Sequence, residues 1–404
     1  MKVLVVGSGG REHALARALR RSTRLTELHA APGNPGIARL GRCHPVRAQD
    51  VEGLVELASA LRIDLVVVGP EAPLVAGLAD ELRHTGITVF GPSAAAARIE
   101  GSKSFAKDIL EAAGVATAAR LDEPVAPCVI KADGLAAGKG VFVCRSQDEA
   151  NVALERAQTI GEAIVIEELL NGDEVSLFAV CDGERALALP VAKDYKRLEA
   201  GDRGPNTGGM GAFSPVQGLD RAEAARLVDL VHRPVLAELA DRGTPFIGLL
   251  YAGLMLTEAG PRVLEFNCRF GDPETQVVLP RLEGDLLSLL ASAASGDLGA
   301  ESVAETSDAA VTIVLASPGY PDAAEAGIEI QGVDEAESLG AVVYHAGTAR
   351  RDDRLVSAGG RVLNVTAVGS SLSEARALAY RAVERIDFPG AQYRRDIALR
   401  GPDC

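Results

Sequence analysis

A dense group of polar residues lies in one short stretch of the chain, residues 264–276. If its first residues form a strand, Glu265, Asn267 and Arg269 share one face, because side chains alternate along a strand with a period of two. Carboxylate and amide oxygens suit Mg2+, which also keeps waters and substrate phosphates as ligands. A planar guanidinium suits a carboxylate or a phosphoryl group. The alternative is an exposed strand face with an internal ion pair.

A lysine, Lys131, ends an apolar run and opens the glycine-rich segment 131–140. This is not a Walker loop, because Gly134 and Gly138 enclose three residues instead of four, and Gly140 leads into another apolar run. A buried ammonium needs an anionic partner, since an unpaired buried charge is strongly penalised. Lys131 therefore indicates a nucleotide phosphate. An ordinary hairpin whose lysine reaches solvent is the alternative.

An apolar segment that could face a base follows at residues 164–170. The backbone of a strand offers a donor and an acceptor to an adenine edge, and a carboxylate a few residues on, such as Glu174, can accept both ribose hydroxyls. Glutamates that flank a buried strand are also found simply solvated. Both interpretations stay open.

Two glycine loops could face substrates. Residues 7–12, Gly-Ser-Gly-Gly-Arg-Glu, follow a strand and open a helix, so that free backbone N–H groups and the helix dipole form an anion site. A dinucleotide fits less well because Glu12 stands at the place of the third glycine, and a bare tight turn is a further alternative. The loop 206–211 is either substrate-facing or a mobile surface loop.

The elements that must position these residues fall into three groups. The first hundred residues alternate strand and helix patterns, with strands near 3–6, 28–30 and 65–69 and helices near 11–20 and 51–61. Such a βαβαβ order predicts a parallel sheet with its ligands beyond the strand ends. The loops at 7–11, 32–34 and 69–71 should then share one pocket.

The rest of the chain predicts two further units. Residues 102 to about 318 mix helices with hairpin-like strands at 128–132, 140–144, 163–168 and 175–181. After Gly319, strands at 342–345 and 362–368 precede an amphipathic helix, 373–386, capped by Ser373. The expected fold class is α/β and α+β multidomain, with an N-terminal parallel-sheet domain and a small C-terminal α+β domain.

Composition excludes several classes of function. The 404 residues carry a formal net charge of -15, which argues against nucleic acid or an anionic membrane as partner. No apolar run approaches the roughly 20 residues of a membrane span, and a cytoplasmic protein is expected. The six cysteines form no C-x-x-C pair, so buried reduced thiols are expected instead of disulfides or zinc ligands.

The order and wording of the motifs resemble those of the glycinamide ribonucleotide synthetases over nearly the whole chain. The matching segments are Gly-Gly-Arg-Glu-His13, Ala-Pro-Gly-Asn34, Val-Gly-Pro-Glu-Ala-Pro73, Glu-Gly-Ser-Lys103, Val-Ile-Lys-Ala-Asp-Gly-Leu-Ala-Ala-Gly-Lys-Gly140, Gly-Pro-Asn-Thr-Gly-Gly-Met-Gly211, Glu-Phe-Asn-Cys-Arg-Phe-Gly-Asp-Pro-Glu-Thr-Gln276 and His345-Ala-Gly-Thr348. The resemblance implies a substrate domain at 1–101, an ATP-grasp domain at 102–320 with a mobile lid at roughly 115–186, and a C-terminal domain at 321–404.

The resemblance also implies the residues that bind nucleotide and metal. The implied contacts are Lys103 and Lys131 for the ATP phosphates, Glu167, Glu168 and Leu169 for adenine, Glu174 for ribose, and Glu265 and Asn267 for Mg2+ or Mn2+. No second carboxylate ligand occurs at 251–256, so a second metal is left open.

The substrate residues follow in the same way. The implied phosphoribosylamine and glycine contacts are Gly9, Gly10, Arg11, Glu71, Asp194 and Arg269, with Arg269 and Lys131 in catalytic roles. The segment 119–127 is short for the family, and 157–163 lacks a longer glycine-containing loop, so lid closure is expected to differ.

The implied activity is the ATP-dependent ligation of glycine to 5-phosphoribosylamine, which gives glycinamide ribonucleotide, ADP and phosphate through glycyl phosphate in de novo purine biosynthesis. The partners are then these small molecules only, and the oligomeric state stays open. Another ATP-grasp carboxylate-amine ligase, a formyl-transferring relative, a non-catalytic ATP-binding sensor and a Rossmann dehydrogenase are the alternatives.

Overall fold

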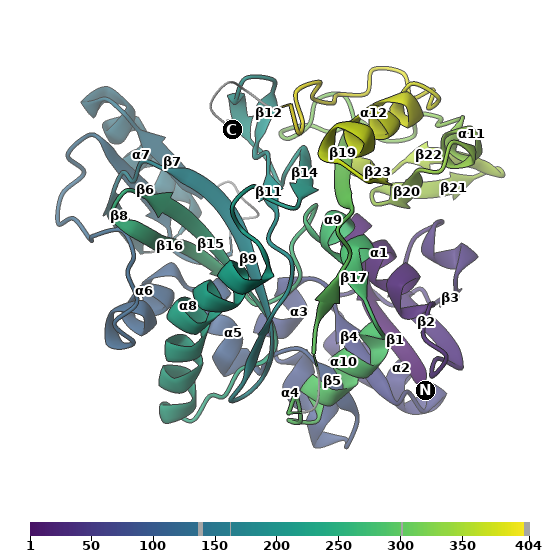
Figure 1. The fold of residues 1–404 in the computed structure, drawn as a ribbon, viewed down its shortest axis with the longest axis horizontal. Helices are drawn as coiled ribbons and strands as arrows, with labels where there is room; N and C mark the ends of the chain where they lie inside the picture. Colours follow the sequence, from purple (N-terminus) through teal and green to yellow (C-terminus); the bar gives the residue numbers. More distant parts are fainter. Residues whose placement is uncertain (136–139, 162, 300–301, 400–404) are drawn as a thin grey trace.

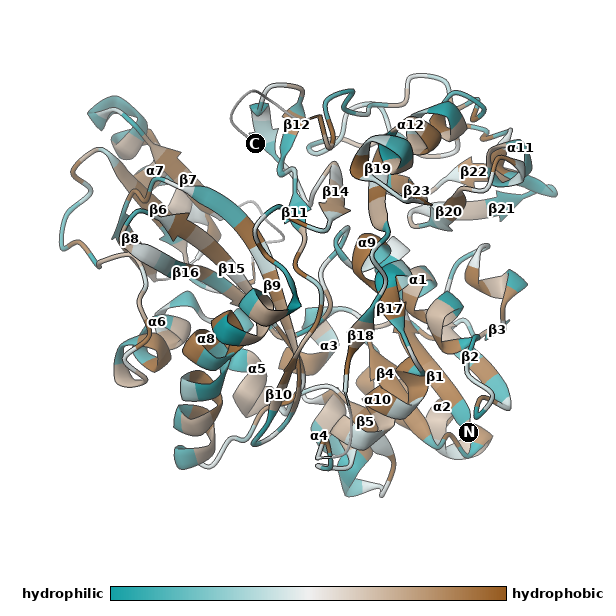
Figure 2. Ribbon diagram, in the orientation of Figure 1, coloured by the Kyte–Doolittle hydropathy of each residue, from teal (hydrophilic) through white to brown (hydrophobic). Residues whose placement is uncertain are grey.

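A computed structural model describes residues 1–135, 140–161, 163–299 and 302–399 (Figure 1). Residues 136–139, part of the predicted glycine hairpin, lie outside this range. At the N-terminus a five-stranded parallel sheet has the order β3 (Arg42–Cys43), β2 (Glu27–Pro32), β1 (Lys2–Gly7), β4 (Leu65–Val68), β5 (Thr88–Phe90). The central strands are runs of buried valine and leucine, as expected for a sheet covered on both faces (Figure 2). The βαβ prediction is confirmed.

The helices of this part include the two predicted near 11–20 and 51–61. They are α1 (Gly10–Leu19), the 3-10 helix η1 (Ile37–Arg39), α2 (Val51–Leu61), α3 (Glu71–Val75), α4 (Leu78–His84), α5 (Ala94–Gly101) and α6 (Lys103–Ala112). The side chain of Ser93 accepts from the backbone of the first turn of α5, and that of Ser102 does the same for α6.

Two antiparallel sheets face each other in the middle of the chain. The smaller has the order β7 (Val141–Cys144), β6 (Cys128–Ala132), β8 (Ile164–Glu168), and α7 (Gln147–Ile160) covers it with a separate small core. The larger has the order β10 (Ala186–Ala188), β9 (Asp173–Asp182), β15 (Ile247–Thr257), β16 (Gly260–Asn267), and α8 (Arg221–Asp241) packs on it.

The boundary predicted for the lid needs a correction. The unit with its own core ends at Glu168, whereas the predicted lid ran to 186. Strand β9 belongs to the larger sheet because it is buried over most of its length and pairs with β15 from Asp173 to Asp182. Its apolar run fits either sheet when judged from sequence alone.

The C-terminal sheet has the order β11 (Lys193–Asp194), β14 (Gly211–Ser214), β19 (Ala309–Ala316), β23 (Arg361–Gly369), β20 (Val342–His345). This sheet crosses the boundary expected at residue 321, because the fully buried β19 is its central strand. The remaining elements are β12 (Arg197–Glu199), β13 (Arg203–Asn206), α9 (Thr275–Val278), the 3-10 helix η2 (Leu279–Arg281), β17 (Leu282–Glu283), α10 (Leu286–Ala294), β18 (Ala304–Glu305), α11 (Val333–Ser338), β21 (Thr348–Arg351), β22 (Arg354–Ser357) and α12 (Leu372–Val383).

The parallel sheet and the larger antiparallel sheet are held together by shared apolar cores. One core joins residues of β1 and β4 to residues of β9, β15 and α8. A second core joins β1 and α1 to β9 and β15 through α10, which contacts β5, β9 and β15. Because burial of apolar area is the main force in folding, this arrangement fixes the N-terminal loops against the middle of the chain.

The structure gives the state of the cysteines and the character of the helices. In the described part of the chain five cysteines are free thiols, four of them buried, and burial raises the pKa of Cys144 to about 11. None of the described helices has the length and apolar character needed to cross a membrane.

The last helix begins two residues before the position that its predicted cap implies. Ser371 Oγ, and not Ser373, accepts from Glu374 N at 3.2 Å, and α12 starts at Leu372. Ser371→Ala should cost about 1 kcal/mol in local stability, and amide exchange in the first turn of α12 should accelerate roughly fivefold. Ser373→Ala is the matched control and should leave exchange unchanged. Equal effects of the two variants would contradict the assignment of the cap.

Candidate functional site

The strand register of the larger sheet places several polar side chains on one face. Gly253 and Met255 lie two residues apart on β15, and their partners across the sheet are Glu265 on β16 and Glu174 on β9. Directly opposed residues share a face, so these two carboxylates project to the same side as Asn267, which pairs with Tyr251. The alternation predicted for Glu265 and Asn267 is confirmed.

The guanidinium of Arg269 joins this face, although its residue lies beyond the strand. Strand β16 ends at Asn267, so the prediction that one strand carries all three residues is wrong for Arg269. Ion pairs hold its side chain instead: Nε lies 3.1 Å from Glu71 Oε2, and Nη2 lies 2.9 Å from Glu100 Oε1. The predicted pair of substrate residues, Glu71 and Arg269, is therefore brought together.

Glu100 is a member of the site that sequence reasoning missed. Its side chain is 8% exposed, and it accepts from Cys268 N at 2.7 Å. With its amide nitrogen turned toward Glu100, Asn267 also donates to Oε1 at 2.9 Å, so the metal ligand on Asn267 would be its oxygen. Burial raises the pKa of Glu100, and Arg269 opposes the shift. Only the motif Glu-Gly-Ser-Lys103 could have drawn attention to it.

The anionic partner that Lys131 was expected to need is Glu167. Lys131 Nζ lies 2.6 Å from Glu167 Oε2 and donates to Leu264 O at 2.8 Å, next to Glu265. Lys107 Nζ lies 2.8 Å from the other oxygen of Glu167. All three charged side chains are less than a tenth exposed. Glu167 thus serves two ammonium groups, a role that its sequence position did not reveal.

The start of α6 is tied to the end of β6. Asp133 accepts from Lys103 N at 2.5 Å and from the hydroxyls of Ser102 and Ser104. Lys103 Nζ in turn donates to Gly134 O at 2.8 Å. Burial lowers the pKa of Lys103, with Glu265 opposing the shift. This contact places Lys103 beside the glycine hairpin, on the same side as Glu265.

Strand β8, which was predicted to meet adenine, forms backbone hydrogen bonds along both of its edges. Strand β8 pairs with β6 on one side, and on the other side Glu168 N donates to Ala119 O at 3.0 Å. The side chain of Glu168 accepts from Ala119 N at 2.8 Å. The hypothesis of an adenine contact in this segment therefore rests on the backbone from Leu169 onward.

Lys196, which sequence reasoning did not assign, lies between Glu174 and Glu265, the two carboxylates predicted to meet ribose and metal. Lys196 Nζ pairs with Glu174 and lies 3.6 Å from Glu265 Oε1. Burial would lower the pKa of Lys196, but Glu174 and Asp194 raise it well above its ordinary value. Burial alone would likewise raise the pKa of Glu265, yet Lys196 and Lys131 hold it below its ordinary value.

The predicted substrate residue Asp194 lies in the same charged region. Burial raises its pKa to about 8, with Lys196 opposing the shift and Glu274 adding to it. Burial also raises the pKa of Glu274, whose Oε1 accepts from Ser176 Oγ at 3.2 Å. Burial is therefore the main reason that the pKa of each carboxyl lies above its ordinary value.

At the N-terminal glycine loop, the carboxylate of Glu12 occupies part of the predicted anion site. Gly9 N donates to Glu12 Oε2 at 2.5 Å, so one of the N–H groups predicted to face a phosphate is not free. A Cβ at Gly69 would lie 2.0 Å from Glu12 Oε1, which explains the glycine there. Arg11 bonds to Glu12 at 2.6 Å and donates to Phe270 O at 3.1 Å, which places it beside Arg269.

The C-terminal sheet covers this loop. A Cβ at Gly10 would lie 2.3 Å from Asn364 Oδ1 and 2.7 Å from Gln276 Nε2, so only glycine permits the approach of β23 and α9. Arg361 Nη1 donates to Gly208 O and to Asp272 O, both at 2.6 Å. Arg361 thereby joins the glycine loop 206–211 to the Gly-Asp-Pro turn at residues 271–273.

Two buried histidines extend this contact. His345 N donates to His13 Nδ1 at 2.9 Å, and Asn34 Nδ2 donates to His345 O at 2.8 Å. Burial lowers the pKa of His13 to about 3 and that of His345 to about 4, so both rings are neutral at pH 7. The N-terminal loops 7–13 and 32–34 therefore dock on the C-terminal strand β20.

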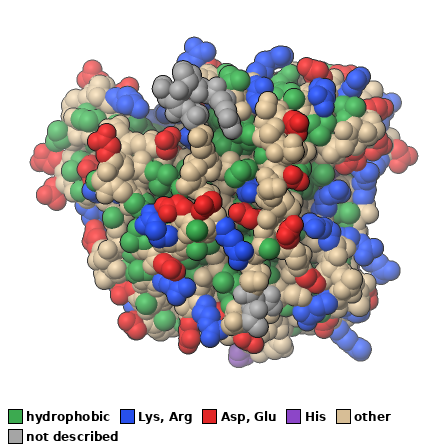
Figure 3. All heavy atoms as spheres, viewed as in Figure 1, with side chains coloured by type: hydrophobic (Ala, Val, Ile, Leu, Met, Phe, Trp, Pro, Cys, Tyr) green, Lys and Arg blue, Asp and Glu red, His purple; other side chains and the backbone are tan. Residues whose placement is uncertain are grey.

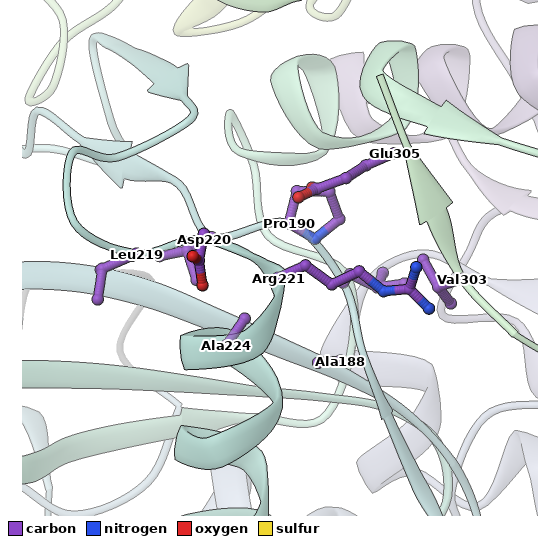
Figure 4. A pocket seen from close by; sticks show the side chains of 10 residues that line it. Ala188, Pro190, Leu219, Asp220, Arg221, Ala224, Val303 and Glu305 are labelled. Atoms are coloured by element: carbon purple, nitrogen blue, oxygen red, sulfur yellow. The ribbon is translucent and has the colours of Figure 1, made fainter. Parts of the chain in front are cut away.

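The charged region is separate from the hollow drawn in Figure 4. That hollow is lined by Pro190, Arg221, Val303 and their neighbours, and contains none of the residues above. On the face drawn in Figure 3, acidic and basic side chains are interspersed over much of the surface. In the described ranges no three His, Cys, Asp or Glu side chains group as a metal site, and Mg2+ bound with a phosphate chain does not require such a group.

Two facing antiparallel sheets with lysines and carboxylates between them define the ATP-grasp class of proteins. The structure is similar to the biotin carboxylase domain of a Hydrogenobacter thermophilus 2-oxoglutarate carboxylase, with a TM-score of 0.70 and 16% identity over 97% of this chain and 91% of that one. At this identity the likeness concerns the fold alone.

Family models described as the N, ATP-grasp (A) and C domains of phosphoribosylglycinamide synthetase match residues 1–100, 101–275 and 310–400. A phosphoribosylamine–glycine ligase of Streptomyces coelicolor is 52% identical over 99% of both chains, and one of Mesorhizobium japonicum is 48% identical over 98% of this chain and 97% of that one. The phosphoribosylamine–glycine ligase of Thermotoga maritima has a TM-score of 0.85 at 35% identity, over 98% of this chain and 100% of that one. The chain belongs to the phosphoribosylglycinamide synthetase family.

The bond network at Glu167 predicts the stability of the smaller sheet. Glu167→Gln leaves two buried ammonium groups without their carboxylate, which should cost about 3 kcal/mol. Amide exchange in β6 and β8 should accelerate accordingly. Glu168→Gln is the matched control and should cost less than about 1 kcal/mol, because its pair with Arg262 is partly exposed.

Adding Lys107→Met to Glu167→Gln should recover part of the loss, since one of the two orphaned charges is removed. Exchange in β6 and β8 that is no faster in Glu167→Gln than in Glu168→Gln would contradict the role of Glu167.

Proposed function

We propose that the chain ligates glycine to 5-phosphoribosylamine in an ATP-dependent, ADP-forming reaction that gives glycinamide ribonucleotide, a step of de novo purine biosynthesis. The observation that carries the proposal is the position of the Glu265 carboxylate, which has Lys103, Lys131 and Lys196 around it. The chain is also 52% identical to a phosphoribosylamine–glycine ligase. Lysines converging on one carboxylate suit a polyphosphate that brings a divalent cation.

The nucleotide would lie between the two antiparallel sheets. The backbone after Glu168 faces adenine, Glu174 accepts the ribose hydroxyls, and Lys103 and Lys131 contact the phosphates. Their positions support this order, because Glu174 and Glu265 project from one face of the larger sheet and Lys131 reaches that face from β6. The smaller sheet has its own core, as expected for a unit that closes over a ligand.

The metal-binding residues would be Glu265 and Asn267, whose oxygens are of the kind that Mg2+ prefers. When bound there, Mg2+ supplies positive charge to the phosphate oxygens during transfer. The protein itself would hold those oxygens with lysines that are already in position. Such preorganised electrostatic stabilisation accounts for most of the rate enhancement in phosphoryl transfer.

The first chemical step joins glycine's carboxylate to the γ-phosphoryl group. Arg269 is held by Glu71 and Glu100 at the end of β16, and its guanidinium orients the carboxylate of glycine for attack. A carboxylate oxygen forms a bond to the γ-phosphorus, the bond to the bridging oxygen breaks, and ADP leaves. The product is glycyl phosphate, an activated acyl group.

The second step uses the N-terminal loops. Phosphoribosylamine would lie near Gly9, Gly10, Arg11 and Glu71. Two contacts bring these residues close to Arg269: Arg11 donates to Phe270 O, and Glu71 pairs with Arg269. Its amine attacks the acyl carbon, loses a proton, and phosphate leaves with the oxygen that came from glycine. Docking of the C-terminal sheet over loop 7–13 keeps water from the acyl phosphate.

The proposal predicts ADP release that requires both glycine and phosphoribosylamine. Glu265→Gln should lower this rate roughly a hundredfold, equivalent to about 3 kcal/mol of transition-state stabilisation, because the charge that holds Mg2+ is lost. Glu258→Gln, an exposed glutamate at the β15–β16 turn, is the matched control and should keep the parent rate.

A coupled assay of ADP with each substrate omitted in turn makes the measurement. ADP release that does not depend on glycine would overturn the proposal, and so would a near-parent rate in Glu265→Gln at saturating Mg2+.

A further inference from the structure

Lys196 lies beside Glu265, and neither of the two chemical steps above assigns it a contact with a substrate. Lys196 lies between β11 and β12, and its side chain is 32% exposed. Its ammonium pairs with Glu174 and lies 3.6 Å from Glu265 Oε1. The same cation therefore contacts the carboxylate proposed for ribose and the carboxylate proposed for the metal.

The backbone that carries Lys196 is fixed by its neighbours. Thr207 N and Thr207 Oγ1 donate to Lys196 O at 2.7 and 2.8 Å, and Gly209 N donates to Thr207 Oγ1 at 3.0 Å. The preceding residues 193–194 pair with β14 of the C-terminal sheet. Lys196 thus reaches across from one sheet to carboxylates on another, and the glycine loop 206–211 sets the point from which it reaches.

Three lysines converge on Glu265 from three different segments. Lys103 comes from the start of α6, Lys131 from β6, and Lys196 from the bend after β11. Of the three, Lys196 is the one paired with Glu174. It therefore marks the path between the two carboxylates.

The chemistry of a nucleoside polyphosphate follows that path. With its ribose on Glu174 and a phosphate-bound metal on Glu265, the inner phosphates of the ligand must run past the ammonium of Lys196. A mobile four-carbon stem lets the ammonium exchange carboxylate oxygens for phosphate oxygens without movement of the backbone.

We propose that Lys196 is a further nucleotide-binding residue, which contacts the α- and β-phosphates of ATP and competes with the divalent cation for Glu265. The inference rests on the proposed ATP-dependent function and adds one contact to it. Lys196 acts in two opposite directions, because its charge attracts the phosphates and repels the metal.

Because Lys196 is proposed to attract the phosphates and to repel the metal, the proposal can be tested by equilibrium binding instead of turnover. In Lys196→Met, calorimetric titration with ADP in the presence of EDTA should show affinity weakened about tenfold or more, because one phosphate contact is lost. Adenosine, which has no phosphate, should bind within about twofold of the parent. Mn2+ without nucleotide, followed by electron paramagnetic resonance, should bind about threefold or more tightly, because Glu265 no longer has a competing ammonium.

Three variants complete the experiment. Lys193→Met removes the lysine three residues earlier, which pairs with Asp173 at 3.1 Å, and should leave all three affinities unchanged. Lys196→Arg keeps the charge and should restore most of the ADP affinity. If Lys196→Met does not fold, Lys196→Gln takes its place, with the same results expected.

Parallel loss of ADP and adenosine affinity would show that Lys196 only supports the shape of the site, and would overturn the inference. Mn2+ affinity that is unchanged or weaker would do so as well. Failure of the parent protein to bind ADP would count against the proposed function itself, whereas ADP binding that is equal in parent and Lys196→Met counts against the inference alone.

Discussion

The charge on Glu265 is the interaction on which the arrangement of the site depends. Without it, the positive charges of Lys103, Lys131, Lys196 and Arg269 would face one another and repel. Each of the last three has a second carboxylate as well: Glu167 for Lys131, Glu174 for Lys196, and Glu71 with Glu100 for Arg269. Paired in this way, the cations can be held close together at modest cost, as the proposed contacts with phosphates require.

The same charges tie the domains to one another. Glu71 and Glu100 come from the N-terminal part and meet Arg269 at the end of β16. Arg361 on the C-terminal strand β23 holds the Gly-Asp-Pro turn and the glycine loop. Because the N-terminal sheet and the larger antiparallel sheet also share apolar cores, loop 7–13 and the polar face of the larger sheet have fixed positions relative to each other. The proposed attack of an amine on an activated acyl group requires that constraint.

Local pattern predicted the parts of the structure that depend on local chemistry. Period-two alternation placed Glu265 and Asn267 together, and the β-α order predicted the parallel sheet. Pairing over long distances was not predictable in this way: β19 was assigned to the wrong domain, and β9 to the lid, because an apolar strand carries no label for its sheet. Glu100 and Lys196 were missed because their partners are also distant in the sequence. Glu100 meets its partner Cys268 across 168 residues of chain, and no spacing in the sequence records that contact.

The central claim is that glycine's carboxylate attacks the γ-phosphoryl group at the Glu265 site. Glycine labelled with oxygen-18 in both carboxylate oxygens tests it most directly, with ATP, Mg2+ and phosphoribosylamine as the other substrates and mass spectrometry of the products. One oxygen-18 atom is expected in each orthophosphate formed, none in any AMP, and one in the amide product. Unlabelled orthophosphate, or label in AMP, would contradict it.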